Sequence, residues 1–411
     1  MQQSSFRRPG GPRRSYSSRP GRPHSSHKPR YGNGKRKSSK NGKQFIDPTK
    51  FVNAATKPAE QTPYESKHTF ADFGFVKDLQ RNLDEKGYTV PTAIQDQSIH
   101  AAIEGKDVIG LANTGTGKTA AFLLPIIHRL KTDEHKQSAL IIAPTRELAT
   151  QIDDEFRTFA RGMKLYSTVC VGGMNIRPQI QQLARHPHLI IGTPGRLKDL
   201  LDQKALKLSH VNFFVLDEAD RMLDMGFMPD LKAIMSYLPE KRQSLCFSAT
   251  ITPEISRLLD GLLIDPVTVS VRTQETSEHV EQNVVNYDSK EDKFIKLNEI
   301  LDSPEFERIL IFGETKFGVQ RLADTLSRSG KRAEAIHGNK SQPQRQRSLK
   351  AFKDGRVHIL VATDVAARGL DIPNVNLVVN YDTPQTYDDY IHRIGRTGRA
   401  GQAGHALTFV N

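Results

Sequence analysis

The sequence predicts an α/β protein with two tandem parallel-sheet domains, preceded by a basic segment that does not fold. Three observations lead to this expectation. From about residue 68 onward, short and nearly continuous apolar runs alternate with helix-like segments, a pattern typical of strands that are covered on both faces. A polar stretch at residues 272–282 interrupts the alternation, and residues 1–67 show almost none of it. We therefore expect a tail at 1–67, domains at 68–271 and 283–411, and a linker at 272–282.

The N-terminal segment carries the net charge of the whole chain. Residues 1–43 contain 13 of the 59 Lys and Arg residues and no Asp or Glu, so the other 46 basic residues are balanced by 46 acidic ones. A segment rich in Gly, Pro, Ser and Arg buries too little to fold. Tyr16 and Tyr31 offer stacking surfaces beside charges that attract phosphates, which favours an auxiliary RNA contact. A solubilising tail, or attraction to ribosomes or membrane surfaces, is the alternative.

The expected strands follow one another in two groups. The first domain has apolar runs at 107–112, 139–145, 167–173, 188–193, 213–219, 244–250 and 267–271, and the second has runs at 284–287, 308–314, 333–338, 357–363, 377–382 and 405–410. Ligands of such sheets bind at the carboxyl ends of the strands. Because the chain stops one residue after its last run, the sequence leaves open whether the second domain is complete.

The composition also indicates the cellular compartment in which the protein is expected. The sequence has no apolar run long enough for a membrane span and no secretory signal at its Arg-rich start. Its two cysteines, Cys170 and Cys246, each lie in an apolar run, which suits buried free thiols in a reducing compartment. We expect a cytoplasmic protein without a membrane partner.

The stretch "LANTGTGKT", residues 111–119, predicts a phosphate-binding loop. It follows an expected strand and precedes an apolar, helix-like segment, which is the context that such a loop requires. Gly115 and Gly117 allow backbone amides to close on phosphate oxygens, Lys118 supplies positive charge, and Thr119 can ligate Mg²⁺. Ala112 departs from the general pattern, which has glycine there.

The stretch "FFVLDEAD" places three carboxylates directly after an apolar strand. Asp217 ends that strand, so we expect it at the same sheet edge as the phosphate loop, where a Mg²⁺-bound nucleotide needs an acidic partner. Glu218 is expected to orient or deprotonate the attacking water. Asp220 is better placed to pair with other polar side chains.

Several motifs in this order resemble the DEAD-box ATP-dependent RNA helicases of superfamily 2. The resemblance covers about residues 68–411, and it implies two RecA-like domains that bind ATP, Mg²⁺ and RNA. The motifs are "GYTVPTAIQ", "ANTGTGKT", "PTRELA", "GG", "TPGR", "DEAD", "SAT", "QPQR", "ATDVAARGLD" and "HRIGRTGR". Ala93, Asn113 and Glu314 depart from the usual family residues.

The resemblance implies a nucleotide site shared by both domains. Gln95 resembles the family's adenine reader, since its amide can pair with N6 and N7 of adenine but not with the two acceptors of guanine. Phe70 matches the aromatic residue that stacks on the base, although packing in the core is an alternative. Arg396 and Arg399 match arginine fingers, and a basic surface helix is the alternative. The nucleotide-binding residues are then Phe70, Gln95, Ala112, Asn113, Thr114, Gly115, Thr116, Gly117, Lys118, Thr119 and Asp371, of which Lys118 is also catalytic with Glu218, Arg396 and Arg399.

The remaining motif residues match the family's RNA contacts and coupling residues. The expected RNA contacts are Arg146, Gly172, Gly173, Thr193, Arg196, Arg345, Thr363 and Arg368. Basic side chains and backbone amides suit a sugar-phosphate strand, so binding should be largely independent of sequence. Arg146 and Arg345 could instead form surface ion pairs. The expected coupling residues are Asp220, Ser248, Thr250 and His392, and the hydroxyls of "SAT" could alternatively cap the next helix.

We therefore expect an RNA-dependent ATPase, acting as a monomer, that separates short RNA duplexes or remodels RNA–protein complexes. An RNA clamp that uses ATP only to lock is a second hypothesis, although Glu218, Arg396 and Arg399 form a complete hydrolytic set. A DNA translocase is a third, because preference for RNA rests on the resemblance and on contacts with the 2′-hydroxyl.

Overall fold

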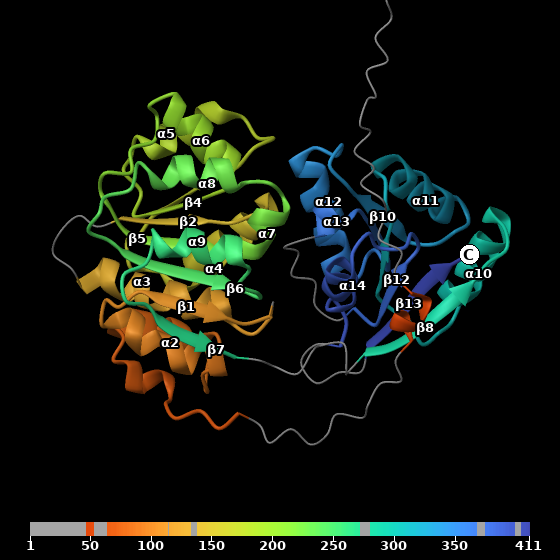
Figure 1. Cartoon of the computed structure of the whole chain (residues 1–411), viewed down its shortest axis with the longest axis horizontal. Coiled ribbons are helices and arrows are strands. Elements are labelled where there is room, and N and C mark those ends of the chain that lie inside the picture. Colours follow the sequence, from red (N-terminus) through yellow and green to blue (C-terminus); the bar gives the residue numbers. More distant parts are fainter. Residues whose placement is uncertain are drawn as a thin grey trace, which may run out of the picture. The chain divides into compact units, whose positions relative to one another are not determined.

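The computed structural model describes residues 47–52, 64–113, 115–132, 138–271, 280–367, 375–398 and 404–411. Within these ranges the chain forms two parallel β-sheets with helices around them (Figure 1). The expected α/β fold with two sheet domains is confirmed. Most of the expected tail and part of the expected linker lie outside the described residues.

The first domain contains a seven-stranded sheet. Its strands are β1 (Val108–Leu111), β2 (Ser138–Ile142), β3 (Ser167–Cys170), β4 (Leu189–Gly192), β5 (Val211–Asp217), β6 (Gln243–Ser248) and β7 (Val267–Ser270). They lie in the order β3-β4-β2-β5-β6-β1-β7, and all paired strands are parallel. Each of the seven expected runs forms one of these strands. Because neighbouring strands are parallel, the loops that follow them open at one edge of the sheet.

Helices of the first domain cover the two faces of this sheet. They are η2 (Phe70–Phe73), α1 (Lys77–Glu85), α2 (Ala93–Ile103), α3 (Lys118–Thr132), α4 (Arg146–Phe159), α5 (Ile176–Leu183), α6 (Pro194–Asp202), α7 (Ala219–Asp224), α8 (Met228–Met235) and α9 (Pro253–Asp260). In β2, Ala139 and Ile141 belong to one core cluster with residues of α1 to α4, whereas Leu140 and Ile142 belong to a second with residues of α5 to α9. Successive side chains of a strand point to opposite faces of the sheet, so each strand contributes to two hydrophobic cores.

The second domain contains a six-stranded parallel sheet in the order β10-β11-β9-β12-β13-β8. Its strands are β8 (Val280–Asn286), β9 (Ile309–Phe312), β10 (Ala333–Ile336), β11 (Ile359–Ala362), β12 (Leu377–Asn380) and β13 (Gly404–Val410), and its helices are α10 (Lys290–Leu301), α11 (Lys316–Arg328), α12 (Gln342–Lys353), α13 (Asp364–Ala367) and α14 (Tyr387–Ile394). Strand β8 begins at Val280, inside the range expected to be linker. Val280 pairs with Gly404 and is fully buried, which explains why the strand starts earlier than the polar sequence suggested.

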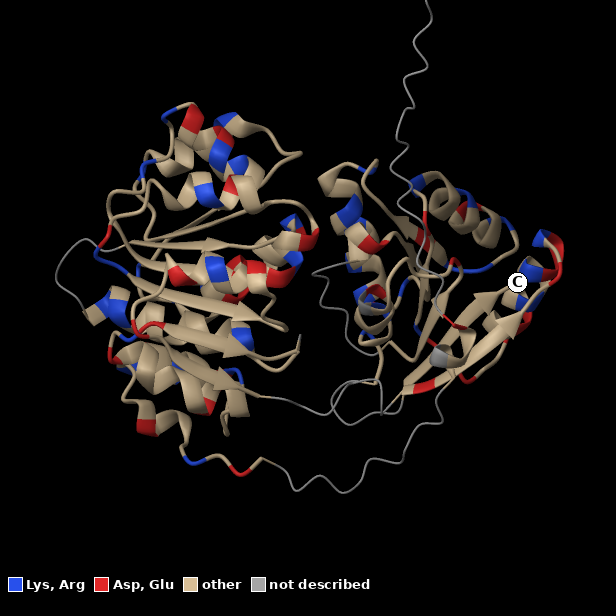
Figure 2. Cartoon of the chain, viewed as in Figure 1, with Lys and Arg blue, Asp and Glu red and all other residues tan. Residues whose placement is uncertain are grey.

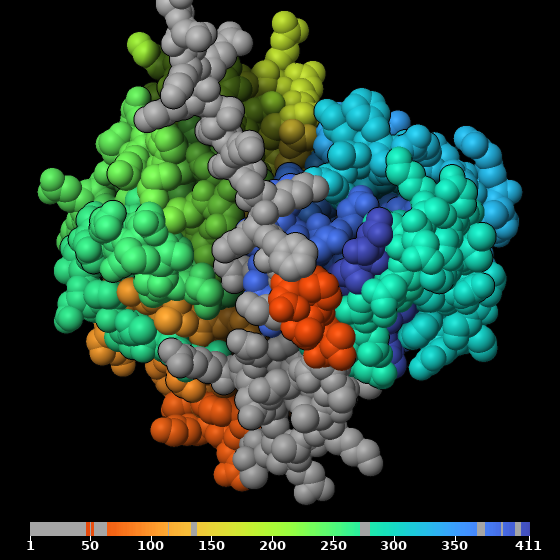
Figure 3. All heavy atoms as spheres, turned by 45° about the vertical axis from the view of Figure 1, so that its right-hand side comes forward, coloured from red at the N-terminus to blue at the C-terminus, as the bar shows by residue number. Residues whose placement is uncertain are grey.

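Two short pieces of the expected tail have a described structure. Residues 64–67 lead into the first domain, and η1 (Pro48–Phe51) forms a single 3-10 turn. Phe51 at the end of η1 is fully buried. Figure 3 shows this turn in red-orange against atoms of the second domain. The sequence-based tail boundary therefore overlooked a packed segment.

The charges on the described parts of both domains are mixed. Positions of Lys and Arg are interspersed with positions of Asp and Glu along the helices and loops (Figure 2). Among the described helices, none is long and apolar enough to cross a membrane. Cys170 and Cys246 are both buried and unpaired, as expected. Burial raises the pKa of the Cys170 thiol to about 12, so neither function nor reactivity is assigned to these thiols.

Candidate active site and nucleic-acid interface

Strand order brings three of the expected motifs to one edge of the first sheet. Strands β5, β6 and β1 are neighbours, so the phosphate loop after β1, the carboxylates after β5 and "SAT" at the end of β6 are adjacent. The backbone amide of Ala112 donates to the carbonyl oxygen of Ser248 at 3.0 Å, which ties the phosphate loop to the end of β6. Residues that are more than a hundred positions apart in the sequence thus form one site.

The phosphate loop has the backbone that its glycines allow. Gly115 has a φ of 87° and Gly117 a φ of 94°, in the left-handed region that favours glycine. Lys118 begins α3, is 7% exposed, and donates through Nζ to the carbonyl oxygen of Ala112 at 2.8 Å. The Lys118 ammonium is therefore held over the loop, where its charge would meet a bound phosphate. Thr114 lies outside the described residues.

Gln95 connects helix α2 to this loop. Its Oε1 accepts from the backbone amide of Thr92 at 2.9 Å, and its Nε2 donates to the carbonyl oxygen of Gly117 at 3.1 Å. A Cβ at position 117 would collide with the Gln95 amide. The side chain of Gln95 thus packs directly against the phosphate loop, and its recognition of adenine stays a prediction.

Phe70 lies in the core of the first domain. Its ring is 2% exposed and packs against Phe73 and Tyr88, with ring centroids 6.0 and 5.5 Å away. This packing corresponds to the alternative that the sequence left open. A base could stack on Phe70 only if the ring were uncovered, so stacking stays a prediction.

Asp217 is a buried carboxylate with an unused oxygen. It is the last residue of β5, is 2% exposed, and its Oδ1 has no hydrogen-bond partner among the described residues. Burial raises the pKa of Asp217; the charge of Lys118 opposes this shift and that of Glu218 adds to it. A buried oxygen without a partner is costly, and a cation bound there would remove the cost.

The surroundings of Asp217 fit Mg²⁺ better than a metal held by protein ligands alone. Among the described residues there is no cluster of three or more His, Cys, Asp or Glu side chains that could hold a metal. Mg²⁺ usually keeps several waters and binds through one or two carboxylates plus substrate phosphates. One free carboxylate beside a phosphate loop meets that requirement, and Thr119 follows the loop as the second candidate ligand.

Glu218 has an unusual backbone and a buried ion pair. Its φ is 54°, in the left-handed region that non-glycine residues seldom adopt. Strained residues of this kind cluster at functional sites, although the chain has four others outside this site. Glu218 Oε2 accepts from Nη1 of Arg221 at 2.8 Å, and both side chains are 4% exposed. Arg221 was not expected from the sequence, although it directly follows "DEAD". The ion pair fixes the orientation of the Glu218 carboxylate.

Asp220 joins the loop after β5 to "SAT". Its Oδ2 accepts from the backbone amides of Ala249 and Thr250, both at 3.0 Å. Ser248 Oγ accepts from the backbone amide of Asp220 at 3.2 Å and donates to the carbonyl oxygen of Thr250 at 2.7 Å. The cap of α9 is Thr252, whose side chain accepts from the amide of Ile255. The structure therefore uses the Ser248 hydroxyl between two loops, not as the helix cap.

A second set of motifs meets at the other half of the same sheet edge. Strands β3, β4 and β2 are neighbours, so "GG" after β3, "TPGR" after β4 and "PTRELA" after β2 are adjacent. The Arg146 guanidinium lies so close to Gly173 that a Cβ there would collide with it. Arg196 donates through Nη1 and Nη2 to the carbonyl oxygen of Met174, each at 3.2 Å. Two arginines and a glycine turn thus form one surface that suits a phosphate backbone. Thr193, the N-cap of α6, is 8% exposed.

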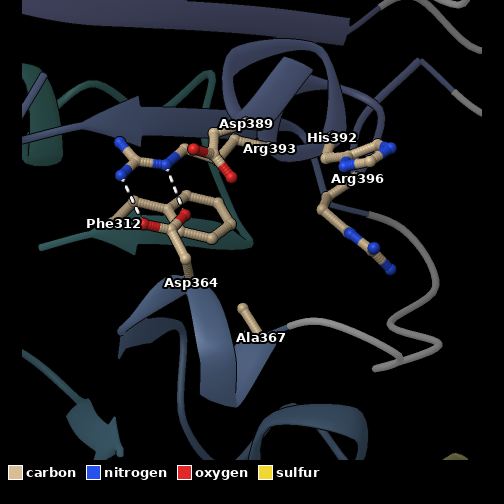
Figure 4. Close-up of a pocket in the computed structure, with 7 residues that line it drawn as sticks. All are labelled: Phe312, Asp364, Ala367, Asp389, His392, Arg393 and Arg396. Atoms are coloured by element: carbon tan, nitrogen blue, oxygen red, sulfur yellow. Dashed lines mark hydrogen bonds and ion pairs between the residues drawn. The ribbon is translucent and has the colours of Figure 1, made fainter. Parts of the chain in front are cut away.

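In the second domain, α13 and α14 line a small pocket (Figure 4). His392 and Arg396 lie together on one side of it, and Arg396 is 3% exposed. On the other side, Arg393 donates to both carboxylate oxygens of Asp364 at 2.6 Å. Arg393 also donates to the Asn380 side chain and to a main-chain carbonyl oxygen. This buried arginine fixes α14 on α13 and so positions the residues that follow.

Arg393 and Asp364 were missed by the sequence reasoning. Both lie inside motifs that it used, "HRIGRTGR" and "ATDVAARGLD", so their motif membership was the available signal. Arg345 lies in α12 and is 8% exposed, and Thr363 directly precedes α13. Arg368, Asp371 and Arg399 lie outside the described residues.

The phosphate loop, the strand-end carboxylates and the separate arginine-lined surface define a nucleotide-hydrolysing protein that acts on nucleic acid. Residues 92–258 match the DEAD/DEAH box helicase family, and residues 292–401 match the helicase conserved C-terminal domain. The chain belongs to the DEAD-box helicase family.

Named relatives agree with this assignment. The chain is 44% identical over 343 residues to the DEAD-box ATP-dependent RNA helicase CshA of Geobacillus kaustophilus, covering 83% of this chain and 73% of the relative. It is 46% identical over 342 residues to the protein of the same name from Streptococcus pneumoniae, covering 83% and 65%. These matches thus span between 65% and 73% of the two relatives.

Solved structures share the fold. S. cerevisiae Dbp5 bound to RNA and ADP BeF3 is 31% identical, with a TM-score of 0.74 over 84% of this chain and 89% of that one. Mss116p, bound to ssRNA and AMP-PNP, is 30% identical, with a TM-score of 0.75 over 85% and 76%.

Proposed function

We propose that this chain is an RNA-dependent ATPase that uses ATP hydrolysis to separate short RNA duplexes or to remodel RNA–protein complexes. One observation carries the proposal. Asp220 and Ser248 tie the carboxylates that follow β5 to the "SAT" loop that follows β6, while the phosphate loop lies at the same sheet edge. The hydrolysis site is thus joined by hydrogen bonds to the "SAT" loop, so a change at the site can alter the conformation of that loop.

The residues of the site divide the work of hydrolysis. Lys118 and the amides of the loop would bind the phosphates of ATP, and Thr119 and Asp217 would hold Mg²⁺. The metal, when bound, neutralises charge that develops on the phosphates. Glu218, oriented by Arg221, would accept the proton of the attacking water. Arg396 would stabilise transition-state charge, a contribution worth about 10³ to 10⁵ in rate for arginine fingers.

The arginine-lined surface supports RNA as the partner of this site. Arg146, Gly173 and Arg196 present charge and backbone to a strand without offering groups arranged to read bases. The similar structures of Dbp5 and Mss116p both contain bound RNA. The basic tail would add further phosphate contacts, and buried free thiols support a cytoplasmic location. A monomer suffices for this chemistry.

The experiment is to measure ATP hydrolysis with no nucleic acid, with a short RNA duplex carrying a single-stranded extension, and with DNA of the same sequence. The proposal predicts strong stimulation by RNA, little by DNA, and strand separation that requires ATP. Equal stimulation by DNA would favour a DNA translocase. ATP-dependent RNA binding without turnover would favour a clamp.

A further inference from the structure

The turn η1 presents one aromatic side chain to the second domain. Asp47 Oδ1 accepts from the Thr49 amide at 3.0 Å and from the Thr49 hydroxyl at 2.8 Å, and Pro48 occupies the first helical position. This cap fixes the turn so that Phe51 points inward. Phe51 is 0% exposed, whereas the next residue, Val52, is 55% exposed. The turn therefore buries the Phe51 side chain, which acts as an anchor to the second domain.

The anchor enters a core cluster made entirely by the second domain. Phe51 shares that cluster with Val280 of β8, Tyr390 and Ile394 of α14, and Ala406 of β13. The Phe51 and Tyr390 ring centroids are 4.7 Å apart, and the planes are inclined by 56°, a geometry that favours aromatic pairs. A residue that precedes the first domain in sequence thus completes the core of the second.

Helix α14 depends on this cluster for its position. Its inner residues, Tyr390 and Ile394, are fully buried, and Tyr390 donates through its hydroxyl to Gln282 Oε1 at 2.8 Å. The outer part of the same helix carries His392, and the chain then leads to Arg396. Removing the Phe51 ring would leave unfilled space beside Tyr390, and a core rarely closes such a space completely.

We propose that residues 47–52 are a built-in part of the second domain, and that Phe51 is a positioning residue for the helix that presents His392 and Arg396. The segment lies outside both regions matched by the family models, which begin at residues 92 and 292. The catalytic part of the proposal rests on the proposed function, but the docking part does not.

The first test is hydrogen–deuterium exchange of the full chain with the substitution Phe51→Ala. Val52→Ala is the matched control, because it removes a neighbouring apolar side chain that is exposed. The proposal predicts at least tenfold faster exchange in α14 and at the start of β8 for Phe51→Ala, unchanged exchange in α3, and wild-type behaviour for Val52→Ala. Unchanged exchange in α14 would overturn the docking.

The second test separates positioning from stability. For Phe51→Ala, RNA-stimulated kcat should fall about three- to tenfold, while KM for ATP should change less than twofold, because the phosphate loop is in the other domain. Phe51→Leu refills part of the space and should recover most of kcat, even if the alanine variant folds poorly. Faster exchange in α14 with unchanged kcat would overturn the positioning role. A wild-type protein without ATPase activity would overturn the proposed function, while the exchange result would still decide the docking.

Discussion

The Asp220 carboxylate accepts a hydrogen bond from the backbone amide of Thr250 at 3.0 Å, which joins the loop after β5 to the loop after β6. Ser248 completes the junction, since its hydroxyl bonds both to the Asp220 amide and to the Thr250 carbonyl oxygen. These hydrogen bonds give a change at the carboxylates a direct connection to the second loop.

Ser248→Ala should therefore reduce strand separation more than it reduces ATP hydrolysis. The substitution removes two hydrogen bonds of the junction, but it leaves the phosphate loop and Glu218 intact. We expect RNA-stimulated hydrolysis within about threefold of wild type and the number of ATP molecules used per duplex to rise roughly tenfold, as a loss of about 1.4 kcal/mol of coupling would give. Parallel ATPase and duplex-separation assays measure both quantities.

Thr252→Ala is the control for this prediction. It removes a hydroxyl two residues beyond Thr250, but that hydroxyl caps α9 and does not contact Asp220. A rise of the ATP requirement in Thr252→Ala equal to that in Ser248→Ala would show that helix stability, and not the junction, is responsible.

Gly173→Ala should weaken RNA binding through Arg146. The added Cβ collides with the guanidinium and also occupies a backbone with a φ of 71°. Displacing one charged contact should cost about 1–2 kcal/mol, or roughly tenfold in RNA affinity, while ATP affinity stays unchanged. Titration of labelled single-stranded RNA measures the first quantity, and titration of a fluorescent ATP analogue measures the second.

Gly226→Ala is the control that separates the two effects of Gly173→Ala, which are the collision with Arg146 and the strained backbone. Gly226 has a φ of 77°, but a Cβ there meets nothing within 4 Å. It thus carries the backbone strain alone. An equal loss of RNA affinity in both variants would contradict a role for the contact between Gly173 and Arg146.

Asp96→Asn should lower stability at neutral pH and have little effect in acid. Asp96 is 3% exposed and accepts from the Tyr64 hydroxyl at 2.5 Å, the Lys67 amide at 2.9 Å and His68 Nδ1 at 2.6 Å. Burial acts to raise the pKa of Asp96, but these hydrogen bonds outweigh it and hold the pKa below its usual value. The charged form therefore stabilises the folded state above about pH 4, the value in unfolded chains, and this stabilisation disappears as the pH falls through the lower, folded value.

Urea unfolding at several pH values between 7 and 3 tests the Asp96 prediction. Wild type should exceed Asp96→Asn by about 2 kcal/mol at pH 7, and the difference should shrink toward pH 3. Glu104→Gln is the control, because Glu104 is exposed and pairs only with Lys106 among the partners described. A constant difference across the pH range would contradict the ionic origin of the effect.

Deleting residues 1–43 should weaken RNA binding and flatten its salt dependence. The deletion removes 13 positive charges and no negative ones. For single strands, the slope of log affinity against log salt is about 0.7 per phosphate contact. Losing even half of the possible contacts of the tail would therefore flatten this slope clearly. ATPase activity at saturating RNA should largely recover. An unchanged slope in RNA titrations would assign the charge to solubility or to another acidic partner.

The parts that sequence reasoning predicted are those with a local signature. Apolar runs identified all seven strands of the first sheet, and parallel strand ends explained why Gly115, Asp217 and Ser248 are close together. The contacts of Arg221 and Arg393 are set by the packing of neighbouring turns. The spacing of apolar residues in the sequence therefore could not predict them. Phe51 was missed because the few apolar residues around it show neither strand nor helix periodicity, and only the tertiary fold supplies the cluster that buries it. Phe70 shows the same limit, since spacing alone cannot say whether an aromatic ring faces a ligand or the core.

The central claim is that Glu218 performs the chemical step at a site that binds ATP through Lys118 and Asp217. Glu218→Gln keeps the size of the side chain and can still accept a hydrogen bond from Arg221, but it removes the base. The most direct measurement is single-turnover hydrolysis of ATP with saturating RNA, alongside ATP and RNA affinities, for wild type, Glu218→Gln and the exposed control Glu254→Gln. The account predicts hydrolysis at least about 10² slower in Glu218→Gln, with both affinities retained and the control unchanged. Hydrolysis at the wild-type rate in Glu218→Gln would contradict it.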